Sequence, residues 1–180
     1  KRPETAEPYF LPETCPVCGA LARRDPDGAA LRCTGAECPA QLLRNITHFA
    51  SRDAMDIEGL GPAVVQQLVD GGLIQNAADL YSLRADDVAK LDRMGTKSAK
   101  NLIQAIEKSK VNDLSKLIFG LGIRQVGEKA AKVLASHFKT FDALEAASVE
   151  ELTEIDDVGE ITAQCIVDYL SESQSQDLLR

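Results

Sequence analysis

Apolar residues recur every three or four positions along most of this chain after residue 38, which is the spacing of one face of an α-helix. The first such stripe, Leu42, Leu43, Ile46 and Phe49, follows Pro39, a residue well suited to the first helical position. The pattern predicts helices at or near residues 39–50, 62–70, 76–81, 96–109, 114–121, 129–138, 149–155 and 163–170. No sustained strand is expected after residue 40.

Residues that start and stop helices flank these stretches. Asp113 can accept a hydrogen bond from the first free amides of the helix that follows it. Ser148 with Glu151 fits a capping box. The pair Gly71-Gly72 ends the helix that begins near Pro62. The chain therefore reads as short helices joined by tight turns, and its fold class is mainly α.

One pattern occurs four times: an apolar residue, two variable residues, an apolar residue, Gly, three variable residues, and a small or β-branched apolar residue. The four copies are Ile57-x-x-Leu60-Gly61-x-x-x-Val65, Leu91-x-x-Met94-Gly95-x-x-x-Ala99, Ile123-x-x-Val126-Gly127-x-x-x-Ala131 and Ile155-x-x-Val158-Gly159-x-x-x-Ala163. Their glycines, at positions 61, 95, 127 and 159, recur at a nearly constant interval. A fixed period in this range marks one supersecondary unit used repeatedly. The pattern predicts a tandem helix-hairpin-helix array of four units.

Four of the five cysteines lie before Pro39, as Cys15-x2-Cys18-x14-Cys33-x4-Cys38. Two close pairs of thiolates suit tetrahedral Zn²⁺, and all-cysteine ligation makes the metal structural. Disulfides are the alternative, but the chain shows no secretion signal. A turn at Pro26-Asp27-Gly28 would join residues 21–25 to residues 29–33 in a small β-ribbon. Cys165, alone in a helical pattern, is expected to be a buried apolar residue, and His48 and His137 to lie in the core or at its boundary.

The net charge of −8 is not spread evenly over the 180 residues. The segment 148–180 holds nine acidic side chains against Arg180 alone, so the middle of the chain is neutral. A negative total therefore does not exclude nucleic-acid binding. No apolar run is long enough to cross a membrane, and the expected location is the cytoplasm.

The glycine of each repeat would stand at the start of a helix, whose free amides and dipole favour anions such as nucleic-acid phosphates. The expected DNA contacts are Gly59, Gly61, Arg93, Gly95, Thr96, Lys97, Arg124, Gly127, Lys129 and Gly159. Such contacts would not read base sequence. Asp156, Asp157 and Glu160 surround Gly159 and would repel phosphate. The alternative is that the glycines only allow helices to pack, which would make the chain a zinc-ribbon and helical scaffold for protein–protein interaction.

The segments Glu37-Cys38-Pro39-Ala40-Gln41 and Asp56-Ile57-Glu58-Gly59-Leu60-Gly61 closely resemble bacterial NAD-dependent DNA ligases, as do residues 45–49. So does the order of a four-cysteine zinc module followed by four helix-hairpin-helix units. One departure is Gly35, where Asn is expected between the last two cysteines. Because Gly and Asn both tolerate a left-handed turn, the zinc site is expected to survive this change.

The resemblance implies the zinc-finger and helix-hairpin-helix region of a ligase that clamps nicked double-stranded DNA. In that family an adenylation domain and an OB-fold precede this region, and a BRCT domain follows it. NAD and Mg²⁺ would bind outside this region, and nick sealing would pass through an adenylate intermediate. The nucleotidylation motif Lys-x-Asp-Gly is absent here, so we expect no catalytic residue in this chain. The expected divisions are a linker (1–12), a zinc finger with its connecting helix (13–50) and a DNA-binding domain (51–180).

Overall fold

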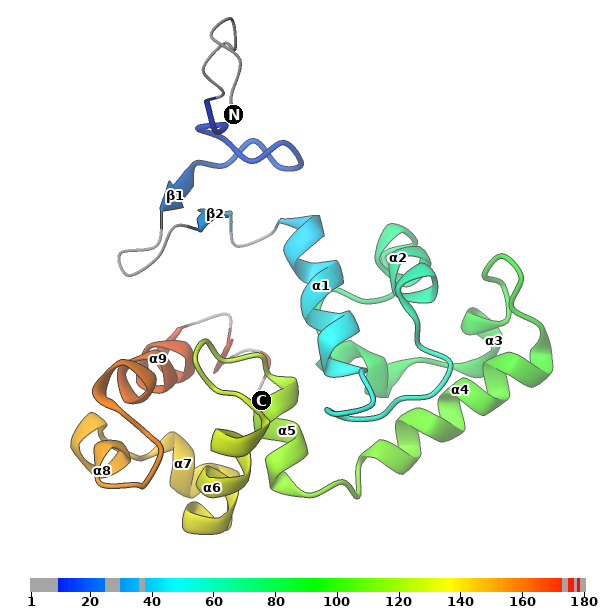
Figure 1. Cartoon of the computed structure of the whole chain (residues 1–180). Helices are drawn as coiled ribbons and strands as arrows, with labels where there is room; N and C mark the ends of the chain where they lie inside the picture. The colour runs from blue at the N-terminus through cyan, green and yellow to red at the C-terminus, as the bar shows by residue number, and fades with distance from the viewer. Residues whose placement is uncertain (1–9, 25–29, 36–37, 173–174, 177, 179–180) are drawn as a thin grey trace, which may run out of the picture. The chain divides into compact units, whose positions relative to one another are not determined.

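The computed structural model describes residues 10–24, 30–35, 38–172, 175–176 and 178 (Figure 1). The chain divides into two compact units, residues 1–42 and residues 43–180. Each unit is described by itself. No helix in the described part of the chain is both long and apolar enough to cross a membrane.

The first unit holds a two-stranded antiparallel ribbon. Strand β1 (Ala22–Arg24) pairs with strand β2 (Leu31–Cys33), with Ala22 opposite Cys33 and Arg24 opposite Leu31. An isolated bridge between Thr14 and Leu21 extends the pairing toward the first cysteines. The ribbon expected from the sequence is therefore present, while the turn expected at residues 26–28 lies outside the described residues.

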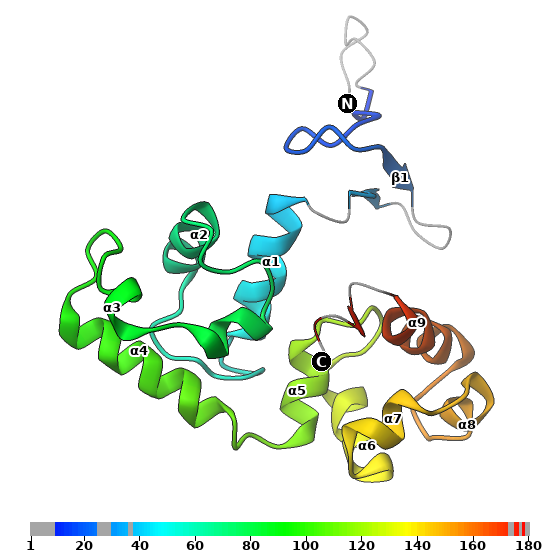
Figure 2. The same ribbon diagram turned by 180° about the vertical axis from the view of Figure 1, so that it is seen from behind.

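The described part of the second unit is helical, and helix α1 (Pro39–Phe49) runs into it from the first unit. Figures 1 and 2 show the helices from opposite sides. The remaining elements are α2 (Pro62–Asp70), the 3-10 helix η1 (Ala78–Ser82), α3 (Ala85–Val88), α4 (Thr96–Ser109), α5 (Leu114–Gly120), α6 (Glu128–Phe138), α7 (Phe141–Glu145), α8 (Val149–Thr153) and α9 (Glu160–Ser171). Helices α3 and α7 were not expected, because helices of one turn carry too little periodicity to detect.

Local capping signals behave as the sequence predicts. The carboxylate of Asp113 accepts a hydrogen bond from the amide of Lys116 at 3.2 Å. Ser148 and Glu151 form a complete capping box at α8. Gly72 takes a left-handed φ of 65° just after α2. Ahead of η1, the side-chain oxygen of Asn76 accepts a hydrogen bond from the amide of Asp79 at 3.0 Å.

The second half of the helical unit surrounds one apolar core. Its buried residues come from α5, α6, α7, α8, α9 and the turns between them: Ile118, Ile123, Val126, Ala131, Leu134, Leu144, Leu152, Ile155, Val158, Ala163, Ile166 and Leu170. In the first half, Val65, Leu68, Leu80, Leu102 and Ile106 are buried in the same way. The repeated apolar positions of the sequence pattern therefore hold the helices together.

The two halves meet where α1 and the loop after it reach the end of α5. The His48 ring nitrogen Nε2 lies 2.8 Å from the carbonyl oxygen of Phe119, and the two rings contact edge to face. A Cβ at Gly120 would lie 3.3 Å from the Phe49 ring, so glycine permits this close approach. His48 is thus a boundary residue, as expected. His137 is exposed and Cys165 only half-buried, which corrects both expectations.

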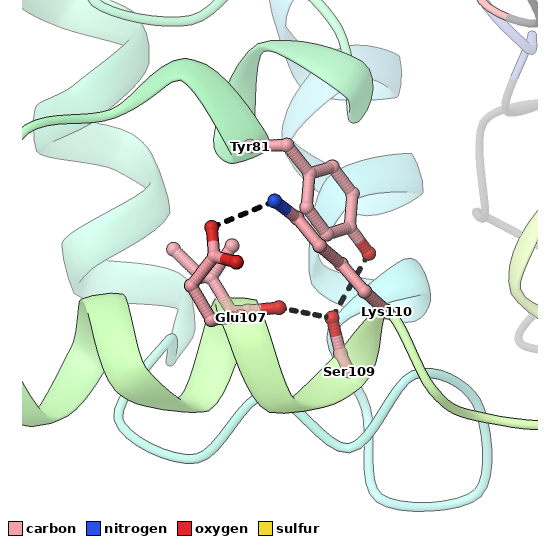
Figure 3. Close-up of polar contacts among 5 residues, drawn as sticks. Tyr81, Glu107, Ser109 and Lys110 are labelled. Atoms are coloured by element: carbon pink, nitrogen blue, oxygen red, sulfur yellow. Dashed lines mark hydrogen bonds and ion pairs between the residues drawn. The ribbon is translucent and has the colours of Figure 1, made fainter.

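A small polar cluster closes the C-terminal end of α4 (Figure 3). The Tyr81 hydroxyl lies 2.9 Å from the hydroxyl of Ser109, which donates to the carbonyl of Ile106 at 2.7 Å. Lys110 pairs with Glu107 and lies 5.7 Å from the centre of the Tyr81 ring. Because Ser109 is only 2% exposed, these bonds satisfy a buried hydroxyl and hold η1 against α4.

Candidate metal centre and nucleic-acid interface

The four N-terminal cysteines converge on one point in the first unit. All four Sγ atoms lie within 4.8 Å of one another, with Cys15 and Cys38 3.9 Å apart and Cys18 and Cys33 3.3 Å apart. The first pair is held by a tight turn, in which Gly19 has a φ of 73° and donates to the carbonyl of Cys15. The five cysteines of the chain are free thiols, so the disulfide alternative does not hold.

The geometry of this cluster fits a tetrahedral zinc ion. Four sulfurs at about 2.3 Å from a central ion lie about 3.8 Å apart, close to the spacing found here. Amides of Cys18 and Val17 lower the pKa of the Cys15 thiol to about 6. At Cys18 the amide of Ala20 lowers the pKa, but the hydrogen bond with Cys33 and burial raise it to about 12. A divalent cation would allow all four thiols to ionise together.

Gly35 has a different role from the one expected. Its φ is not in the left-handed region, so tolerance of a left-handed turn does not explain it. A Cβ at this position would lie 2.9 Å from the sulfur of Cys18 and 3.3 Å from the sulfur of Cys33. Its amide also donates to the Cys33 sulfur at 3.2 Å. Glycine at position 35 therefore leaves room for the sulfur cluster.

In the helical unit the four repeated segments adopt one backbone conformation. We call residues 57–63, 91–97, 123–129 and 155–161 the first to fourth glycine turns, so that each includes the first two residues of the following helix. Their glycines Gly61, Gly95, Gly127 and Gly159 each precede that helix, with φ values of −81°, −84°, −86° and −82°. Any residue adopts such φ values. The turn geometry therefore does not require glycine at these four positions.

The left-handed residue of each turn lies two positions earlier. Gly59, Arg93, Gln125 and Asp157 have φ values of 88°, 58°, 63° and 68°. The sequence did not reveal this position, because only the first turn has glycine there. The positive φ at this position in all four turns nevertheless shows that they share one backbone conformation.

The four helix-starting glycines face open space. At Gly61, Gly95, Gly127 and Gly159, no heavy atom of the described residues, apart from the glycine itself and its two chain neighbours, lies within 4 Å of where a Cβ would stand. No side chain caps the helix that follows any of them. A glycine that serves helix packing would have neighbours at this distance, as Gly120 does. Packing inside this unit therefore does not explain these glycines.

The other expected contact residues are exposed around these turns. Thr96 and Lys97 occupy the first two positions of α4, and Lys129 the second position of α6. Arg93 is exposed beside Asp92, with 3.7 Å between the charged groups. Lys129 is paired with Asp157 of the fourth turn at 2.9 Å. The third and fourth turns are thus coupled, which the sequence did not indicate.

Three families match successive parts of the chain. Residues 14–40 match the NAD-dependent DNA ligase C4 zinc finger domain. Residues 51–108 match the SAM-like helix-hairpin-helix tandem, and residues 116–179 match the helix-hairpin-helix motif. The matched regions contain the sulfur cluster and the four glycine turns.

Several similar proteins are named DNA ligase. The chain is 54% identical over 171 residues to one from Thermoanaerobacter pseudethanolicus, which covers 95% of this chain and 26% of that protein. It is 55% identical over 179 residues to one from Carboxydothermus hydrogenoformans (99% and 27%) and 49% identical over 180 residues to one from Myxococcus xanthus (100% and 27%). The chain thus spans about a quarter of the length of these relatives. It belongs to the NAD-dependent DNA ligase family and corresponds to the part that carries the zinc finger and the helix-hairpin-helix motifs.

Proposed function

We propose that this chain is the non-catalytic DNA-binding region of an NAD-dependent DNA ligase and grips the backbone of double-stranded DNA around a nick. The observation that carries the proposal is the open space at Gly61, Gly95, Gly127 and Gly159. Without a side chain at these positions, an external group can approach the free amides that start α2, α4, α6 and α9. We count each glycine turn and its helix as one of four helix-hairpin-helix units.

A phosphate oxygen is the ligand that such a site favours. The first amides of a helix lack partners within the helix, and the helix dipole adds partial positive charge there. In the second and third turns, Lys97 and Lys129 add full charges on exposed side chains at the start of the helix. These groups contact backbone oxygens and not base edges, so binding is independent of base sequence.

The four turns contribute unequally in this proposal. The second and third turns combine free amides with cations, whereas the first has Gly59 and Gly61 but no cation. The fourth turn has Asp156, Asp157 and Glu160 around Gly159. Phosphate contact is therefore strongest at the second and third turns and weakest at the fourth.

The zinc ion has a structural role, with Cys15, Cys18, Cys33 and Cys38 as its ligands. The first unit has a short ribbon and few buried apolar residues, so metal binding supplies most of the free energy that keeps it folded. NAD and Mg²⁺ would bind elsewhere in the parent ligase, whose catalytic lysine motif this chain lacks. The adenylation, OB-fold and BRCT domains of that ligase are its partners within the same protein.

The test is binding to a nicked duplex at several salt concentrations. If four to six phosphates are neutralised, log Kd should change with log salt with a slope of roughly 4 to 5, and the base sequence should have little effect. A matched intact duplex measures the preference for a nick. A flat salt response would overturn the proposal and favour the protein-interaction scaffold, for which the acidic segment 148–180 is the supporting observation.

A further inference from the structure

We infer that Asp157 of the fourth glycine turn competes with DNA phosphate for Lys129 of the third turn and thereby lowers the affinity of the chain for DNA. This inference rests on the proposed function. It assigns to the fourth turn a role that requires no DNA contact of its own.

The contact that carries the inference joins two neighbouring turns. The Nζ atom of Lys129 lies 2.9 Å from Oδ2 of Asp157, which belongs to the next repeat along the chain. The two side chains are 80% and 48% exposed, so solvent and ligands reach both charges. The Lys129 ammonium group thus already has an anionic oxygen as a partner.

The second turn lacks the corresponding pair. Lys97 follows Gly95 by two residues, just as Lys129 follows Gly127. Within the described residues, the structure gives no ion pair for Lys97. Asp157 occupies the left-handed position that Arg93 occupies in the second turn. The fourth turn therefore has the anion Asp157 where the second turn has the cation Arg93. Asp157 forms an ion pair with Lys129 of the third turn.

A carboxylate and a phosphodiester offer a lysine the same kind of ligand, a negatively charged oxygen. When DNA binds at the third turn, Lys129 must exchange its carboxylate partner for a phosphate. The free energy of the existing pair is then subtracted from that of the new one. Because exposed ion pairs are weak, this exchange lowers affinity only several-fold and does not block binding.

The experiment compares Asp157→Asn with Asp156→Asn. The two substitutions remove the same charge from the same turn, but only Asp157 pairs with a cation among the described residues. Asn tolerates the left-handed φ at position 157, so the turn should keep its shape. Nicked-duplex Kd values and salt slopes are measured for the wild type, both variants and each variant in a Lys129→Gln background.

We expect Asp157→Asn to lower Kd about three- to five-fold more than Asp156→Asn, as an exposed ion pair allows. The difference in Kd should shrink at high salt, because salt screens the exposed Lys129–Asp157 pair while Lys129 neutralises one phosphate with or without Asp157. In the Lys129→Gln background the two variants should be equal.

Equal effects of the two variants with Lys129 intact, or a difference that persists without it, would overturn the inference. Failure of the proposed function would look different: the wild type itself would show a flat salt response, and Lys97→Glu would leave its DNA affinity unchanged.

Discussion

Two groups of helices in the second unit begin in opposite ways. Helices α5, α7 and α8 start at Asp113, Thr140 and Ser148, whose side chains accept hydrogen bonds from the first helix amides. Helices α2, α4, α6 and α9 start at glycines that offer no side chain. Side-chain caps stabilise a protein by about 1 kcal/mol each relative to alanine. In the first group a side chain binds the first helix amides, and in the second no side chain does so.

This contrast bears on function because helices with a side-chain cap and helices that begin at an uncapped glycine lie close together in the sequence. Helix α8 has a complete capping box, and α9, which follows it, has none. A Cβ at the four glycine positions would meet no steric obstacle among the described residues. Glycine there therefore gives up helix stability that a capping side chain would add. The proposed phosphate contact accounts for it.

The largest expected effect is the loss of zinc and of folded structure in the first unit, while the helical unit with the glycine turns stays folded. Replacing Cys33 by Ser removes one of four ligands, so zinc should be released and residues 10–40 should unfold. The helical unit should stay folded, because its core contains none of the zinc ligands. Metal analysis and circular dichroism check both results. A freshly purified wild type without zinc would contradict the assignment of the metal.

Charge reversal at the turns is expected to have the next largest effect. Lys97→Glu and Arg124→Glu place an anion beside phosphate on exposed side chains, so Kd for nicked DNA should rise at least about tenfold at low salt. Asp157→Lys should instead lower Kd, because it removes the carboxylate paired with Lys129 and adds a cation at the fourth turn. Thermal unfolding serves as the control for folding. Unchanged affinity in both glutamate variants would mean that the turns are structural.

Filling the open space tests the glycines directly. In the double variant Gly95→Ser and Gly127→Ser, serine can cap both helices, so stability should rise by a few tenths of a kcal/mol to about 1 kcal/mol. DNA affinity should nevertheless fall about tenfold, because the new side chains occupy the approach to the amides. Chemical denaturation and Kd measurements report the two effects. A fall in both stability and affinity would instead indicate a packing role.

The smallest effect is expected when a side-chain cap is removed from a helix that does not begin at one of the four glycines. Ser148→Ala removes the capping box of α8 and should lower stability by about 1 kcal/mol. Nicked-duplex affinity should not change, because this helix start lies outside the four turns. A loss of affinity as large as that of the glycine variants would show that the two groups of helices do not differ in function.

Much of this architecture could be read from local sequence. The start of α4 at Thr96 and its end at Ser109 agree with the apolar spacing, and Asp113 and Ser148 cap the helices they were expected to cap. The four cysteines were also identified from spacing alone. Helix caps can be predicted because the interacting groups lie within a few residues of one another. The cysteine site can be predicted because closely spaced cysteine pairs form either a metal site or disulfides.

Other features were decided only by the tertiary structure. The glycine repeat was visible in the sequence, but whether those glycines serve packing or face open space depends on which distant side chains surround them. The space that Gly35 leaves for two sulfurs is likewise set by how the ribbon folds back on the first cysteine pair. The Lys129–Asp157 pair joins two successive repeats, and no local pattern signals it. Periodicity and caps determine where helices begin and end, whereas open space and ion pairs between turns arise only when the helices pack.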